Sequence, residues 1–269
     1  MKICLFILCS VFFPVCGWAV DNLRFPDIRA IGIGGNEVTQ SLLYNPSLVA
    51  LSTVKSVHIE SFNRYQLKEL TWFSSHFSCP NEWLPFGVNI SSFGYDAWRE
   101  SRFRCFVGKS LGRKWSLGIG IQYHLLQVEG VERALSSLST DVGATFSLVD
   151  NLFIGMLIKD LPSVCLQKNN LDYKPFNNYL LQIGFQWTII NDLLMAVSAG
   201  SEKERSLIVH TGIEYTAFDS FHLRMGLQTA PLLPSLGIGY DLLRFSIDIA
   251  AQYHSTLGIS SGLGITYRF

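Results

Sequence analysis

From residue 54 onward, hydrophobic and polar side chains alternate along short segments of the chain. In one of them, Leu223 and Met225 alternate with His222 and Arg224. Since successive side chains of a strand point to opposite faces, the alternation predicts strands with one apolar and one polar face. Fourteen such segments are predicted: 54–65, 68–77, 84–93, 101–110, 114–127, 138–148, 151–159, 179–190, 192–201, 205–216, 219–229, 234–242, 243–253 and 256–269.

These strands predict an all-β fold, a closed antiparallel transmembrane β-barrel of about fourteen strands over residues 54–269. Hydrophobic residues make up 48% of the chain, yet after the N-terminus no apolar run reaches the roughly 18 residues of a spanning helix. Aromatic residues recur toward the ends of the apolar stripes, as at a membrane interface. Long predicted connections at 94–100, 128–137 and 160–178 alternate with short turns, which is typical of outer-membrane barrels. A β-sandwich in the periplasm is the structural alternative.

The last predicted strand, 256–269, carries Tyr267 and Phe269 at its end. It resembles the closing strand of bacterial outer-membrane β-barrels. This resemblance implies the outer membrane as the location and its lipid as a partner.

The first nineteen residues have one lysine, an apolar core and small residues at Gly17 and Ala19. They predict a signal peptide at 1–19 that is cleaved after Ala19. A lipoprotein acylated at Cys16 is the alternative.

The mature chain shows no sequence pattern of a disulfide scaffold, a metal site or a nucleic-acid surface. Cleavage would leave Cys79, Cys105 and Cys165, whose wide spacing indicates neither a disulfide scaffold nor a metal site. The 21 basic and 21 acidic residues balance, so no nucleic-acid surface is expected. No cofactor or metal is predicted.

Residues 20–53 are predicted to form a lead-in and a short plug segment. Asp21 to Ala30 is expected to be extended, and a brief helix is expected after Asn36, an N-cap residue type. The helix must end before Pro46 because proline disfavours helical backbone at the residue before it.

The glycine pair Gly34–Gly35 and the element Tyr44-Asn45-Pro46 resemble the N-terminal segment of FadL-like outer-membrane barrels, in particular the PorV and PorQ branch of type IX secretion. Leu48 stands where that branch usually has glycine. The resemblance implies a non-enzymatic role in protein secretion or surface attachment, with secretion-system or surface proteins as partners. The alternative within the FadL-like family is a passive transporter of small hydrophobic or amphipathic solutes.

Polar residues of the strands are expected to gather in the lumen and to pair across it, because unpaired buried charges are costly. Such a lumen is wet or salt-bridged rather than apolar, which weakens but does not exclude a fatty-acid conduit of the FadL kind, whose path should be lined by apolar groups. The network is predicted to include Asp141, His210, Glu214, His222, Arg224, Arg244, Asp248 and Arg268.

Two further features of the sequence bear on function. The string Gly258–Gly262 fits G-x-S-x-G, which would make Ser260 the nucleophile of an outer-membrane hydrolase. It lies inside a predicted strand with no helix after it, whereas the nucleophile elbow needs a strand-to-helix turn. The long connection 160–178 is hypothesised to cap the pore or to receive a partner.

Overall fold

The computed structural model describes residues 27–131, 133–166, 179–202 and 206–269. The predicted signal peptide at 1–19 lies outside these residues, as does most of the connection 160–178. None of the helices in the described ranges is long and apolar enough to cross a membrane.

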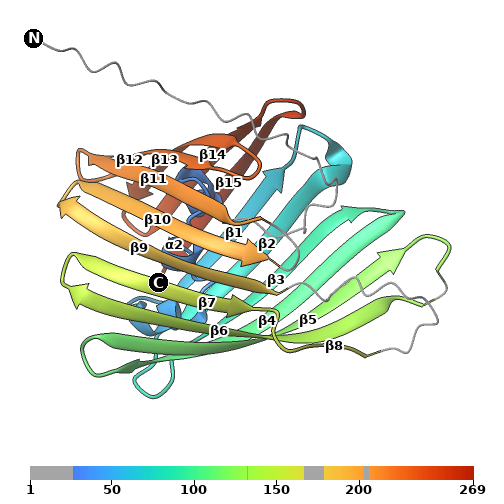
Figure 1. Cartoon of the computed structure of the whole chain (residues 1–269), viewed down its shortest axis with the longest axis horizontal. Helices are drawn as coiled ribbons and strands as arrows, with labels where there is room; N and C mark the ends of the chain where they lie inside the picture. Colours follow the sequence, from blue (N-terminus) through green and yellow to red (C-terminus); the bar gives the residue numbers. More distant parts are fainter. Residues whose placement is uncertain (1–26, 132, 167–178, 203–205) are drawn as a thin grey trace, which may run out of the picture.

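The described chain forms a closed antiparallel barrel of fourteen strands, which confirms the predicted fold (Figure 1). Each strand of the ring pairs with the next, and β1 pairs with β15 to close it, with His58 opposite Thr266. The ring consists of β1 (Ser56–Asn63), β2 (Thr71–Cys79), β3 (Phe86–Tyr95), β4 (Trp98–Leu111), β5 (Trp115–Val128), β6 (Leu135–Val149), β7 (Leu152–Lys159), β9 (Leu180–Ile190), β10 (Leu193–Glu202), β11 (Ile208–Ala217), β12 (Phe221–Gln228), β13 (Leu233–Leu242), β14 (Phe245–His254) and β15 (Gly258–Arg268).

The ring is uneven at the end opposite the C-terminus, which we call the loop end. Strands β4, β5 and β6 have 14, 14 and 15 residues and project beyond the rest of the barrel (Figure 1). A short additional strand, β8 (Ser163–Cys165), pairs with the projecting part of β6, while β7 pairs directly with β9. The prediction of a long connection at 94–100 is wrong. Strand β3 continues to Tyr95 and β4 begins at Trp98, so only a tight turn joins them.

Along the strands, apolar side chains mainly face outward and polar side chains mainly face the lumen. On β12, Leu223 is 44% exposed on the outside and Arg224 is 5% exposed on the inside. Ile247 and Asp248 repeat this arrangement on β14. An apolar outer surface on a closed sheet is what hydrocarbon requires, because lipid cannot satisfy polar groups.

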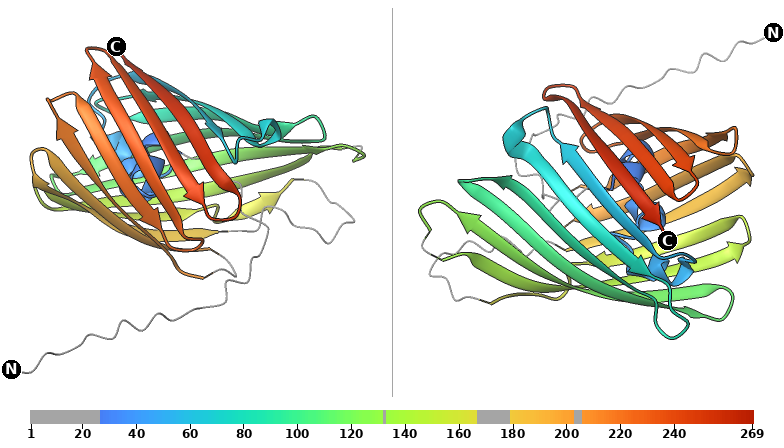
Figure 2. Two further views of the ribbon diagram at one scale, coloured as in Figure 1. Left: turned by 90° about the horizontal axis from the view of Figure 1, so that it is seen from above. Right: turned by 180° about the vertical axis from the view of Figure 1, so that it is seen from behind.

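Residues 27–55, here called the inner segment, run through the interior of the barrel (Figures 1 and 2). They contain α1 (Ile28–Gly32), α2 (Glu37–Gln40) and the 3-10 helix η1 (Pro46–Leu51), and a second 3-10 turn, η2 (Lys68–Leu70), precedes β2. Helix α1 packs on β12–β15, α2 on β7 and β9, and η1 on β4–β6.

The start of the inner segment differs from the extended lead-in predicted up to Ala30. Helix α1 begins at Ile28 because the Asp27 carboxylate accepts a hydrogen bond from the Ala30 amide, 3.1 Å away. Asn36 does precede α2, but its side chain makes no capping bond and donates instead to the Ile33 carbonyl.

Replacing Ile249 by arginine should lower the free energy of unfolding by about 2–4 kcal/mol, because the side chain faces outward at mid-strand, where lipid cannot hydrate a charge. Urea unfolding of the barrel in lipid vesicles measures this loss. Leu243→Arg is the matched control, since Leu243 is fully exposed in the turn after β13. Equal losses at the two positions would contradict a lipid-facing surface.

Candidate functional site

The glycine turn of the inner segment lies directly against the barrel wall. Gly34 and Gly35 have φ angles of +74° and +84°, which glycine adopts without strain. A Cβ atom on Gly34 would lie 2.5 Å from the Thr211 carbonyl oxygen, and one on the wall residue Gly226 would lie 2.0 Å from the Gly34 nitrogen. Backbone therefore meets backbone here, and no larger residue fits without displacement.

Two wall side chains hold this turn by hydrogen bonds. The Gly34 amide donates to the Ser235 hydroxyl at 3.1 Å. Nδ1 of His210 donates to the Gly34 carbonyl at 2.8 Å. The predicted lumen residue His210 is thus engaged with the inner segment.

Four charged side chains form a continuous line from α1 into the wall, here called the charged chain. Glu214 accepts from Arg29 at 2.9 Å and from Arg224 at 2.5 Å, and Arg224 also contacts Asp248 at 2.5 Å. A Cβ atom on Gly239 would lie 2.7 Å from the Arg224 guanidinium, so the glycine makes room for this side chain. The signs alternate along the chain, and each of its buried charges has a partner.

The element Tyr44-Asn45-Pro46 shapes the turn between α2 and η1. The buried Asn45 side chain accepts from the Ser47 amide at 3.1 Å and donates to the Val38 carbonyl at 2.8 Å. Pro46 is the first residue of η1, where proline is favoured because its nitrogen needs no acceptor. This element therefore fixes the path of the inner segment.

A second charged group surrounds Tyr44. Arg104 donates to the Tyr44 carbonyl at 2.9 Å and pairs with Asp141 at 2.8 Å. The Lys159 ammonium lies 3.9 Å from the centre of the Tyr44 ring, a cation–π arrangement. Asp141, a predicted lumen residue, is completely buried in this group.

The remaining predicted residues lie near the C-terminal end of the barrel. His222 contacts Asp241 at 3.2 Å, and Arg268 reaches the same carboxylate at 3.4 Å. Arg244 is a correction to the prediction: it is exposed in the turn between β13 and β14 and does not face the lumen. The structure thus divides the predicted network into separate groups.

The lumen also has an apolar part, which the predicted polar network does not include. Phe62, Trp72 and Phe93 point inward from β1, β2 and β3 and pack against Ile28 and Ile31 of α1. The Trp72 and Phe93 rings meet edge to face with centroids 5.1 Å apart. Their inward orientation follows from alternation with exposed neighbours, so assigning faces on the first three strands would have found them.

Arg29 and Arg104 were also missed. Arg104 shares the polar face of β4 with Glu100 and Arg102, and this spacing is visible in the sequence. Arg29 lies in a helix too short to give a periodic signal.

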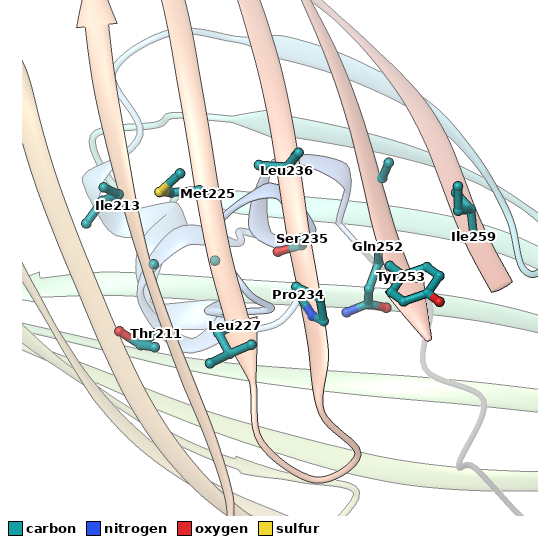
Figure 3. A pocket seen from close by; sticks show the side chains of 13 residues that line it. Thr211, Ile213, Met225, Leu227, Pro234, Ser235, Leu236, Gln252, Tyr253 and Ile259 are labelled. Atoms are coloured by element: carbon teal, nitrogen blue, oxygen red, sulfur yellow. The ribbon is translucent and has the colours of Figure 1, made fainter. Parts of the chain in front are cut away.

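An apolar pocket of about 710 Å³ lies in the outer side of the wall formed by β11–β15 (Figure 3). Ile213, Met225 and Leu236 form part of its lining, and the smaller Thr211 and Ala251 leave the space. The pocket is also lined by Gly212 and Gly226, whose inward faces lie against Ile33 and Gly34 of the inner segment.

Ser260 does not have the geometry of a hydrolase nucleophile. It lies within β15 rather than at a strand-to-helix turn, and its hydroxyl accepts a hydrogen bond from the Tyr65 amide at 3.1 Å. In the part of the chain that the structure describes, no three histidine, cysteine or acidic residues are grouped as metal ligands.

Solved structures of other proteins share this barrel architecture. A FadL homologue of Pseudomonas aeruginosa superimposes with a TM-score of 0.65 and 12% identity, covering 92% of this chain and 99% of that one. The fold is FadL-like. The toluene transporter TbuX of Ralstonia pickettii gives a TM-score of 0.65 at 11% identity, covering 91% and 98% of the two chains. A mutant of the monoaromatic hydrocarbon channel TodX gives 0.64 at 11% identity, covering 92% and 99%. No protein-family model matches the chain, and no curated protein matches it by sequence.

Replacing Glu214 by glutamine should lower the free energy of unfolding by about 3 kcal/mol. The substitution leaves Arg224 with one carboxylate partner and leaves Arg29 without a carboxylate partner from the barrel wall. Losing one partner of a buried ion pair is costly. The loss is expected at the lower end of the usual range because Arg29 is partly exposed. Urea unfolding in vesicles provides the measurement.

The isosteric control is Asp219→Asn in an exposed turn, where a change below about 0.5 kcal/mol is expected. A loss at Glu214 as small as that of the control would show that the charged chain contributes nothing to the stability of the barrel.

Proposed function

We propose that the protein is a passive route across the bacterial outer membrane for small hydrophobic or amphipathic solutes. The observation that carries the proposal is the apolar wall pocket of about 710 Å³, with the inner segment directly behind it. A pocket that faces hydrocarbon on one side and reaches the lumen wall on the other suits a solute that partitions into lipid. Location in the outer membrane is supported by the FadL-like fold and the apolar outer surface.

The apolar part of the lumen also supports this proposal. The aromatic side chains of Phe62, Trp72 and Phe93 provide an interior surface that an apolar solute can contact. Ile28 and Ile31 of α1 cover that surface, so passage requires α1 to move away. The FadL-like neighbours include a toluene transporter and a monoaromatic hydrocarbon channel, which makes a single-ring hydrocarbon the first solute to test.

Replacing Ala251 by tryptophan should fill the wall pocket and lower the initial rate of toluene uptake several-fold. Uptake of radiolabelled toluene is measured in Gram-negative host cells with an intact lipopolysaccharide layer, because phospholipid vesicles are themselves permeable to toluene. Ile247→Trp is the control, since Ile247 faces outward on the same strand, β14, but does not line the pocket. Uptake that does not depend on the wild-type barrel would refute the proposal.

A role in protein secretion or surface attachment of the PorV and PorQ type is the second proposal. It is favoured by the inner segment and ion pairs that occupy the lumen, because an occupied lumen leaves the loops as the working surface. Under this proposal, the affinity-tagged barrel should recover secretion-system or surface proteins from membranes of its native host in stoichiometric amounts. The same tag on an unrelated outer-membrane barrel is the control, and equal recovery on both would contradict the proposal.

A further inference from the structure

We propose that a basic patch on the outer rim of the barrel binds the headgroup of an anionic phospholipid. The patch lies at the C-terminal end, where strand register runs from the last residues of β15 through β1, β2 and β3 to the end of β4. This basic rim patch consists of Trp83, Lys109, Leu111, Arg113, Lys114 and Trp115, all of them exposed. The inference adds a lipid partner and does not depend on the proposed passage of solutes.

Lys109 places a positive charge on the lipid-facing side of β4. Alternation puts it on the same face as the exposed Phe103, and its partner on β5 is the exposed Leu117. Leu111 and Trp115, which pair with each other, follow on the same face. A lysine among lipid-facing apolar residues is stable where its ammonium reaches the headgroups. Lys109 therefore marks the border between hydrocarbon and headgroups.

The β2–β3 connection presents Trp83 at this border. The Lys109 ammonium donates to the carbonyl oxygens of Glu82 and Trp83 at 2.9 and 2.6 Å, and the Trp83 amide donates to the Asn81 side chain at 3.0 Å. These bonds hold the connection in place, yet Trp83 itself is 85% exposed. Tryptophan favours the membrane interface, because its ring contacts acyl chains while its N–H group donates to headgroup oxygens.

The positive charges of the patch have no acidic partner in the protein. Lys109 donates to backbone carbonyls, and Arg113 and Lys114 are exposed in the turn between β4 and β5. Within the residues that the structure describes, no ion pair joins any of the three to an acidic side chain. Their charge therefore remains available to an anion from outside.

Charge is distributed unevenly around this rim. In residues 79–86 and 107–116, three basic residues are accompanied by Glu82 as the single acidic residue. The four turns of the same rim between β6 and β14 carry three aspartates and one arginine: Asp150, Asp192, Asp219 and Arg244. The positive charge is thus concentrated over the ends of β4 and β5, which indicates a partner bound on that side.

Continuity with the apolar wall identifies this partner as a phospholipid. Leu111 and Trp115 are exposed directly beside the basic residues, so an acyl chain can lie on the wall while the phosphate meets the charges. Short turns are typical of the periplasmic side of outer-membrane barrels, and the leaflet on that side consists of phospholipids. Phosphatidylglycerol fits the excess positive charge, whereas the ammonium of phosphatidylethanolamine is repelled by Arg113 and Lys114.

The test is native mass spectrometry of the folded barrel, titrated in detergent micelles with phosphatidylglycerol or phosphatidylethanolamine that have identical acyl chains. Wild type should bind phosphatidylglycerol more than tenfold more tightly, since each of two uncompensated basic residues contributes a factor of about five at an anionic surface. Arg113→Gln/Lys114→Gln should reduce this preference to less than about twofold. Trp83→Ser should weaken the binding of both lipids alike, because the indole contacts the interface whatever the headgroup.

The matched control is Lys68→Gln/Arg133→Gln, which removes the same charge from exposed positions at the loop end and should keep the preference. A heat-dependent shift in electrophoresis verifies that each variant is folded, and excess glycerol phosphate should not displace the lipid. A wild-type preference below twofold, an unchanged preference in Arg113→Gln/Lys114→Gln, or an equal loss in the control would overturn the proposal. Unchanged binding of both lipids by Trp83→Ser, or displacement by glycerol phosphate, would also overturn it.

Discussion

The constraint on which the rest of the structure depends is the absence of water in hydrocarbon. Each backbone N–H and C=O group within the bilayer needs a partner in the protein, so the sheet must close, and β1 does so by pairing with β15. Closure combined with side-chain alternation then sends polar groups into an enclosed lumen. There they must pair with one another or with the inner segment, and the charged chain and the Arg104–Asp141 group are the result.

Apolar packing contributes more than ion pairing to the attachment of the inner segment. Ile28, Ile33, Val38 and Val49 are completely buried, and each contributes about 1.5–3 kcal/mol on the transfer scale. The attraction within a buried ion pair is largely offset by desolvation. The charged chain therefore contributes to the position of α1 more than to its affinity, because any other placement of α1 separates Arg29 from Glu214.

Strand positions were predictable because a period of two persists over many residues, and fourteen predicted segments match the ring. The position of helix α1 was not predictable, because five residues give no periodicity and the helix begins where Asp27 caps it. Arg244 was assigned to the lumen because strand 243–253 was predicted to begin immediately, whereas Leu243 and Arg244 form the turn. The pairing of Glu214 with Arg29 could not be predicted, because Arg29 is 185 residues away in sequence and only the three-dimensional path brings it near.

At one level of the barrel, the wall between β11 and β14 has small residues on both its inner and its outer face. Inside, Gly212 and Gly226 let the backbone of the inner segment touch the sheet; outside, Thr211 and Ala251 leave a pocket. Alternation makes the two faces independent, so the requirement for glycine inside does not produce small residues outside. The pocket and the glycine turn therefore lie on opposite faces of the same part of the wall, so a displacement of the turn would act on the residues that line the pocket.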